Sequence, residues 1–394
     1  MIWLILFISN FLYYNLAKTK IKRLSYKLSI KPVCNPHYYG LFIISLFNIL
    51  FVSSLLIKKI FFLNESVFFN ISSLLALNLF ISFIFYKIDL SFNARQNYDL
   101  ILKNFFLLIS LICILISSLI IILLFKETLK FFHLINVGDF LFGLNWSPQT
   151  DSIEELNYSF GVIPVLLGTL LIVIISIIIS VPIGILSAIY LSEYASNKTK
   201  LLVKPVIEIL SAIPTIVYGY FAALIIGPKI RNIGEYFNIN ISTESALNAG
   251  IVMGIMIIPF VMSLSYEVFN SISKTHRDAS FALGATKAET ITKIILPSAM
   301  PNLLSVILLA ISRAIGETMI VTMASGLAAN LTFNPLNSVT SLTAQIVLLL
   351  TGDQEFNSPK TLAAFGLAFI LFVMTLILNL ISFLITKKYS KYYE

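Results

Sequence analysis

Long apolar runs constrain this chain more than any other feature of its sequence. A helix needs about 20 mostly apolar residues to cross roughly 30 Å of hydrocarbon, and about nine runs come close to this length. They lie near residues 1–17, 38–57, 67–86, 104–125, 162–191, 205–227, 246–267, 303–329 and 362–385. Because lipid offers no hydrogen-bond partners to the backbone, each run predicts a helix. The sequence therefore predicts an all-α protein that crosses a membrane many times.

The charge distribution supports a membrane environment. Hydrophobic residues make up 58% of the chain and charged residues 12%, which is about half the charged share of a typical soluble protein. The formal net charge is +8, but the Lys and Arg residues form short clusters between the apolar runs. This arrangement is typical of membrane topology and not of a nucleic-acid-binding face. We expect contact with membrane lipid and none with nucleic acid.

The first apolar run indicates how the chain is oriented. No basic residue precedes it, no small-x-small cleavage site follows it, and a basic cluster at residues 18–31 comes directly after it. These features predict a retained span with the N-terminus outside and not a cleaved signal peptide. In this orientation, 19 of the 27 Lys and Arg residues fall on the inside, as the positive-inside rule requires. The C-terminus is then cytoplasmic.

The longest inside loop has local chemistry that predicts two short helices. Residues 278–284 are mostly helix formers that end at Gly284, a residue suited to a helix C-terminus. Thr286 and Glu289 have the Ser/Thr-x-x-Glu spacing of a capping box, which begins a second helix. Pro297 is expected to limit that helix. On periodicity alone, an amphipathic linker that rests on lipid headgroups remains the alternative.

The spacing in this loop resembles the EAA loop of ABC importer permeases. Asp278-Ala279-Ser280, three residues, Gly284, nine residues and Ile294-Ile-Leu296-Pro297 follow the pattern Glu-Ala-Ala-x3-Gly-x9-Ile-x-Leu-Pro. Asp278 replaces Glu with a shorter acid, and Ser280 replaces the second Ala. The resemblance implies that residues 278–297 sit in a groove of an ATPase subunit and transmit its closure. The expected coupling residues are Asp278, Ala279, Gly284, Leu296 and Pro297.

The chain lacks the sequence signature of an ATP site. No Gly-x4-Gly-Lys-Ser/Thr phosphate loop occurs in it, and that loop is what cradles nucleotide phosphates. We therefore expect no cofactor in this chain, no enzymatic activity of its own, and ATP bound by a separate subunit. The three histidines, His37, His133 and His276, are scattered without metal-ligand spacing. No metal site is expected.

Three ionisable residues lie within the apolar runs: Glu208, Arg313 and Glu317. A charge at the bilayer centre costs about 2.5–3.5 kcal/mol on insertion scales, so such residues pair or face a polar path. Arg313 and Glu317 have i, i+4 spacing and would share one helix face. They are either a structural ion pair or a gate that binds an anion through the planar guanidinium. Glu208, near a span end, has the same two interpretations.

The segment around Arg313 resembles the permeases of phosphate ABC transporters. Arg313-Ala-Ile-Gly-Glu-Thr-Met319 followed by Val321-Thr-Met323 is similar to the PstC type more than to its PstA-type sister. Residues 208–219 and the segment Thr351–Phe356 agree with it, so the resemblance runs from about residue 100 to 394. It implies a type I ABC importer permease fold in a bacterial inner membrane. The implied partners are a PstA-type permease, a dimer of ATP-binding subunits and an external phosphate-binding protein.

The same comparison predicts the domain organisation. Residues 1–100, with about three spans, resemble the N-terminal extension of long PstC-type proteins through Tyr38-Tyr-Gly40 and the basic loop before it. Residues 101–160 form one span and an external loop, and residues 161–386 form the permease core. Two other functions remain open: an ABC permease for another anion, and a secondary anion transporter that works without ATP.

Overall fold

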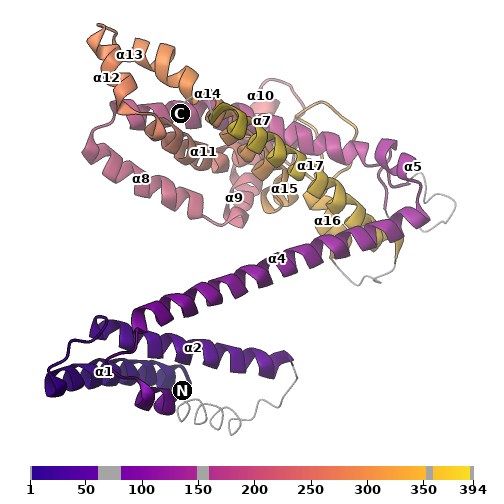
Figure 1. Cartoon of the computed structure of the whole chain (residues 1–394). Coiled ribbons are helices and arrows are strands. Elements are labelled where there is room, and N and C mark those ends of the chain that lie inside the picture. Colours follow the sequence, from indigo (N-terminus) through magenta and orange to yellow (C-terminus); the bar gives the residue numbers. More distant parts are fainter. Residues whose placement is uncertain (1, 61–80, 149–158, 352–357, 391–394) are drawn as a thin grey trace. The chain divides into compact units, whose positions relative to one another are not determined.

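The structure is a computed structural model that describes residues 2–60, 81–148, 159–351 and 358–390. Helices dominate these residues, which contain no β-strand beyond two isolated bridges. The predicted all-α class is therefore confirmed (Figure 1). The chain divides into two compact units, residues 1–120 and residues 121–394. The expected domain boundaries at residues 100 and 160 stay predictions.

The first unit is built on two antiparallel helices. α1 (Ile2–Leu28) packs along α2 (Pro36–Ile60), and the short connection between them requires this arrangement. The unit also contains the helical residues 81–87 and the first part of α4 (Ala94–Leu134). Lys20 caps the C-terminal end of the helical residues 81–87, because its Nζ donates hydrogen bonds to the carbonyls of Phe85 at 2.7 Å and Tyr86 at 3.1 Å. The basic cluster thus also has a structural role.

The second unit is organised around α7 (Ile163–Ile189) and α11 (Ala246–Ser271). Small residues let these two helices approach closely. A Cβ on Gly250 would lie 2.7 Å from the Cβ of Ile175, and a Cβ on Gly254 would lie 3.1 Å from the carbonyl oxygen of Ser176. α11 is the most enclosed of the candidate spans, with 61% of its most apolar stretch buried. It is the central helix of the unit.

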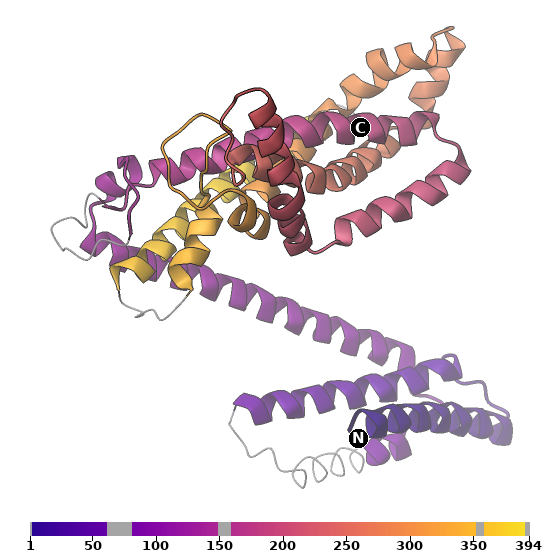
Figure 2. The ribbon, with the colours of Figure 1, turned by 180° about the vertical axis from the view of Figure 1, so that it is seen from behind.

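The other helices of the second unit follow in chain order around this pair. They are α5 (Val137–Phe142), η1 (Tyr190–Tyr194), α8 (Asn197–Ala212), α9 (Thr215–Phe221), η2 (Ala222–Ile226), α10 (Gly227–Tyr236), α12 (Lys274–Ala282), α13 (Lys287–Thr290), η3 (Ile291–Ile295), α14 (Leu296–Ile315), α15 (Met319–Ala324), α16 (Leu342–Leu350) and α17 (Pro359–Ser390). The η segments are single π-helical turns. α12 and α13 extend from one end of the unit (Figure 1 and Figure 2).

Five helices among the described residues are long and apolar enough to cross a membrane, and a sixth span results if one bent pair is counted. α4, α7, α11 and α17 fall on expected runs. α1 and α2 also form helices on the expected runs 1–17 and 38–57, but they are not among the five. Most of the expected span 67–86 lies outside the described residues. The described chain therefore accounts for five or six of the about nine expected spans.

The expected span 205–227 is not one straight helix. α8 and the helix that starts at Thr215 meet at a bend of 82°. Pro214 causes the break, because it lacks an N–H and forces the preceding Ile213 into an extended conformation with ψ 128°. Tyr218 stabilises the bend by donating its hydroxyl to the carbonyl of Leu210 at 3.1 Å.

The expected span 303–329 is also wrong in its bounds. The spanning helix begins earlier, at Lys287, and ends at Ile315 with Gly316 as its C-cap. Glycine is a poor helix former, and the Thr343 hydroxyl donates to the carbonyl of Glu317 at 2.7 Å. The neighbouring segment thus supplies a hydrogen-bond donor to a carbonyl that the break leaves without a helical partner. Lipid has no such donor. α15 is a separate short helix.

The close approach of α7 and α11 gives a direct test of the packing. We expect Gly250→Leu to destabilise the protein by about 1–3 kcal/mol, because a side chain there would collide with Ile175 and force the helices apart. The measurement is the midpoint of thermal unfolding in detergent. Ile255→Leu is the control, since Ile255 is on α11 but 41% exposed. Equal midpoints for the two variants would contradict this packing.

Candidate functional site

The expected coupling loop folds as two helices joined at Gly284. α12 ends in a Schellman motif, in which the Gly284 N–H donates to the carbonyl of Phe281 at 2.9 Å and the Ala285 N–H donates to that of Ser280 at 3.2 Å. Gly284 has a φ of +83°, and a Cβ there would meet nothing within 4 Å. Glycine is therefore required by the backbone conformation and not by lack of space. The predicted joint is confirmed.

The second helix begins with the predicted capping box. The Glu289 N–H donates to the Thr286 hydroxyl at 3.3 Å, and the Thr286 N–H donates to the Glu289 carboxylate at 2.9 Å. The prediction that Pro297 limits this helix is wrong. The π-helical turn η3 directly precedes Pro297. Its wider i→i+5 hydrogen-bond pattern accommodates the proline, which has no N–H to donate, so one helix runs from Lys287 to Ile315.

A pair of hydroxyls holds the two loop helices together. Ser280 on α12 and Thr290 on α13 are 3% and 1% exposed, and their hydroxyl oxygens are 2.8 Å apart. The Ser that departs from the EAA pattern thus forms a buried hydrogen bond. An Ala at this position would leave the Thr290 hydroxyl with only its helical bond to the Thr286 carbonyl.

The outer side of the loop is largely exposed, although Lys287 lies over the Tyr194 ring with its Nζ 4.9 Å from the ring centre. Asp278, Ala279 and Gly284 are exposed, as is Pro297, while Leu296 is partly buried. Two apolar side chains also point outward: Leu283 is 90% exposed and Phe281 is 44% exposed. The loop therefore presents apolar groups beside one carboxylate at the end of the unit. Such a surface suits contact with another protein.

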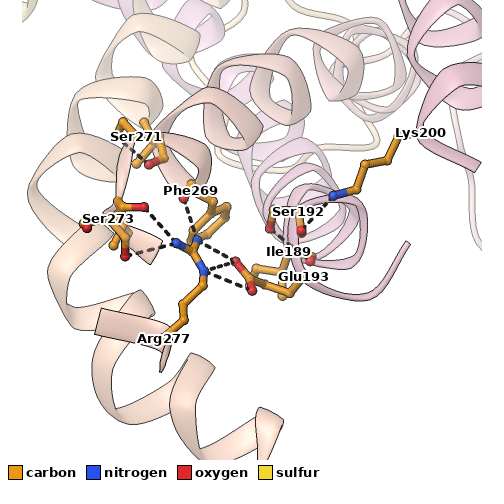
Figure 3. A network of polar contacts seen from close by, with 10 residues as sticks. Ile189, Ser192, Glu193, Lys200, Phe269, Ser271, Ser273 and Arg277 are labelled. Carbon is orange, nitrogen blue, oxygen red and sulfur yellow. Dashed lines mark hydrogen bonds and ion pairs between the residues drawn. The ribbon is translucent and has the colours of Figure 1, made fainter. Parts of the chain in front are cut away.

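Arg277, which sequence reasoning missed, ties the loop to the helical bundle. Its guanidinium forms an ion pair with Glu193 of η1, with Nη2 and Oε1 2.7 Å apart, and the two side chains are 15% and 8% exposed (Figure 3). It also donates to the carbonyls of Phe269 and Ile272, each at 2.8 Å. The only sequence signal was a basic residue beside Asp278, because its partner is 84 residues away.

The predicted proximity of Arg313 and Glu317 on one helix face is wrong. α14 ends at Ile315, so Glu317 lies in the break before α15. Arg313 is exposed, its guanidinium lies 5.0 Å from the centre of the Phe260 ring, and its Nη2 lies 3.8 Å from the Met256 sulfur. Within the described residues it forms no ion pair. Apart from this weak bond to sulfur, the guanidinium N–H groups have no hydrogen-bond partner in the described chain.

Glu208 has different neighbours from Arg313 and Glu317. It is exposed on α8, where no residue is fully buried. A small pocket beside it is lined by Lys204, Tyr266 and Met262, and Lys204 lies over the Tyr266 ring at 4.6 Å. The described residues show no contact from Glu208 to Arg313 or Glu317. The functional role of all three stays a prediction.

A polar hollow of about 680 Å³ occurs where the end of α10 meets the segment before α16. Charged and amide side chains dominate its lining, which consists of Arg231, Glu235, Ile239, Asn240, Ile241, Ser242, Thr243, Glu244, Asn330, Asn337 and Ser338. Asn337 and Asn330 also organise the segment, since the Asn330 side chain donates to the Ser338 carbonyl at 3.0 Å. The hollow is shaped by hydrogen-bonded loops and not by packed helices.

The left-handed conformation of Gly284 gives a second test. We expect Gly284→Ala to cost about 1–2 kcal/mol, which weakens the Schellman motif and speeds amide exchange in the peptide 278–290. Hydrogen–deuterium exchange with mass spectrometry measures this. Gly138→Ala is the matched control, because Gly138 is exposed on a helix without a positive φ. Unchanged exchange in the loop of the Gly284→Ala variant would show that the conformation does not depend on glycine.

Comparison with known proteins places these features in a family. A probable ABC transporter permease protein YqgH of Bacillus subtilis is 34% identical over 243 residues, which cover 62% of this chain and 75% of the relative. The phosphate transport system permease protein PstC of Haemophilus influenzae is 31% identical, with 64% and 81% covered. The PstC protein of Pasteurella multocida is 30% identical, with 68% and 92% covered.

A chain in a solved structure of the MetNI methionine ABC transporter in inward-facing conformations overlaps 58% of this chain and 94% of its own length at 17% identity and a TM-score of 0.43. The assignment rests on the sequence matches. The family of binding-protein-dependent transport system inner membrane components matches residues 180–391, which include the loop, Arg313 and Glu208. This chain therefore belongs to that family and is a permease subunit of an ABC importer.

Proposed function

We propose that this chain is the PstC-type half of the membrane pathway of a phosphate importer. Arg313 is the observation that supports an anion such as phosphate as the cargo. Its exposed guanidinium lies on a candidate spanning helix and has no ion-pair partner in the described chain. Its planar fork matches the oxygens of a tetrahedral anion. The relatives whose printed names include phosphate transport support the same cargo.

ATP is proposed to act through the loop at residues 278–297. Its exposed Leu283 and Phe281, beside Asp278, form the surface that would contact an ATP-binding subunit. The helix from Lys287 continues without interruption to Ile315 and contains Arg313. An α-helix rises about 1.5 Å per residue, so this one helix extends from the loop to Arg313. A movement of the loop would therefore move Arg313 as well.

The remaining partners follow from the family. A PstA-type permease would complete the pathway, a dimer of ATP-binding subunits would dock on the cytoplasmic side, and an external phosphate-binding protein would deliver cargo. In the predicted orientation the N-terminus is outside and the C-terminus is cytoplasmic. The polar hollow at Arg231 and Glu244 then faces outward, where it offers hydrogen-bonding groups to the binding protein.

Phosphate uptake by cells tests the cargo. Cells that lack their own phosphate permeases are supplied with this chain, a PstA-type permease, an ATP-binding subunit and a phosphate-binding protein. We expect growth on limiting phosphate and uptake of radiolabelled phosphate to be restored. Growth restored on another oxyanion, but not on phosphate, would assign the permease to that anion. Uptake that persists without the ATPase gene would indicate a secondary transporter.

The role of Arg313 is tested in the same cells. We expect Arg313→Gln to abolish phosphate uptake while the complex still assembles, because the anion loses its charged partner. Arg313→Lys keeps the charge without the fork and should restore only part of the rate. Lys130→Gln is the control, since Lys130 is 45% exposed and its ion pair is with Glu127 on the same helix. Uptake at the wild-type rate in Arg313→Gln would reduce Arg313 to a packing role.

A further inference from the structure

One guanidinium joins three elements at the root of the coupling loop. Arg277 belongs to α12, and its Nε donates to both Glu193 oxygens, at 3.2 and 3.3 Å, at the end of α7. Nη2 donates to Glu193 at 2.7 Å and to the Phe269 carbonyl at 2.8 Å, while Nη1 donates to the carbonyls of Ile272 at 2.8 Å and Ser273 at 3.5 Å. All five N–H groups of the side chain are used.

These acceptors are ones that the helices cannot satisfy themselves. Phe269 and Ile272 lie at the C-terminus of α11, where the last carbonyls of a helix have no intrahelical donors. A cation there also opposes the negative end of the helix dipole. Glu193 lies in the π-helical turn that ends α7. Arg277 thus neutralises one helix end and pairs with the carboxylate at another (Figure 3).

The rest of α12 is held far less firmly to α7 and α11. Ser280 is the one residue of α12 that is fully buried, and it bonds to α13. The other α12 side chains, Arg277 apart, are exposed. The connection from α11 to α12 is only the extended pair Ile272 and Ser273. Without Arg277, α12 would be joined to α11 by these two residues and to α13 by Ser280, while Ile291 and Ile295 stay buried in one cluster with Leu191 and Phe269.

We propose that Arg277 and Glu193 are positioning residues that transmit loop movement to α7 and α11. They make α12 and the ends of both helices one rigid body, so that a displacement of the loop shifts the central helix pair as well as α14. The inference rests on the proposed function in one respect, namely that an ATPase moves the loop. The link itself rests on the geometry at Arg277.

Only an arginine can make this set of bonds. A lysine has three donors on one point and cannot reach the carboxylate and the carbonyls of α11 together. Glu193→Gln keeps the size and one acceptor oxygen but removes the charge, so it weakens the tie to α7 while leaving the cap on α11. Removing one partner of a buried ion pair is strongly destabilising in general, so this milder change is the better probe.

The coupling ratio is the readout that separates transmission from stability. The complex is reconstituted in proteoliposomes with its ATPase and binding protein, and phosphate transported per ATP hydrolysed is measured. We expect Glu193→Gln and Arg277→Lys to lower this ratio about fivefold or more while ATP hydrolysis continues. A purely structural role would lower protein yield, transport and hydrolysis together and leave the ratio unchanged, which would overturn the proposal. Lys130→Gln, which breaks an exposed pair, is the control.

A distance measurement on the full chain alone tests the link without any cargo. Spin labels are placed at His276→Cys on α12 and Tyr190→Cys on η1, both exposed, after Cys34 and Cys113 are replaced by Ala. We expect a narrow distance distribution that broadens with Glu193→Gln. An equally narrow distribution in this variant would show that the loop does not depend on the pair. Failure to transport phosphate would overturn the proposed cargo and leave this result intact.

Discussion

The close packing of α7 against α11 is the interaction on which the rest of the permease unit depends. Lipid gives no hydrophobic reason for helices to associate, so contact must come from backbones that fit closely. Gly250 and Gly254 allow this, because neither presents a side chain to α7. The paired helices then present their ends at one level, at Glu193 and Phe269. That is where Arg277 binds and where α12, the first helix of the proposed coupling loop, begins.

Segments that are not helical lie beside the packed helices, where side chains can satisfy their backbone groups. The Thr169 hydroxyl of α7 accepts the N–H of Leu342 at 3.0 Å, and Thr343 donates to the carbonyl of Glu317. Side chains thus satisfy backbone groups that a continuous helix would satisfy itself. The break between α14 and α15 follows from this support. It leaves Arg313 near the end of α14 and Glu317 outside that helix, with no ion pair between them in the described chain.

Local chemistry predicted the two-helix shape of residues 278–290 correctly, but not the continuation of the second helix past Pro297. Gly284, Thr286 and Glu289 lie within six residues of one another, and both motifs that they form are closed by neighbours in the chain. The bounds of the spans were less predictable. Hydropathy registers how apolar a segment is, but it does not show that Pro214 bends one span by 82° or that Thr343 stabilises the break after Ile315.

Long-range contacts were beyond the sequence alone. The bond from Arg277 to Glu193 joins residues 84 positions apart, and each has closer charged neighbours along the chain. Arg313 and Glu317 were predicted to be neighbours from i, i+4 spacing, which holds only if the helix continues. The helix end at Gly316 removed that condition. A tertiary contact therefore decides the partner of Arg277, and a helix end removes the partner expected for Arg313.

The proposed function of this chain is to pass an anion through the membrane in response to ATP. The most direct test is phosphate uptake into proteoliposomes that contain this chain, its partner permease and the ATP-binding subunits, with the external binding protein added. We expect uptake to require ATP and the binding protein and to persist when ion gradients are collapsed. Uptake that needs an ion gradient and ignores ATP would contradict it.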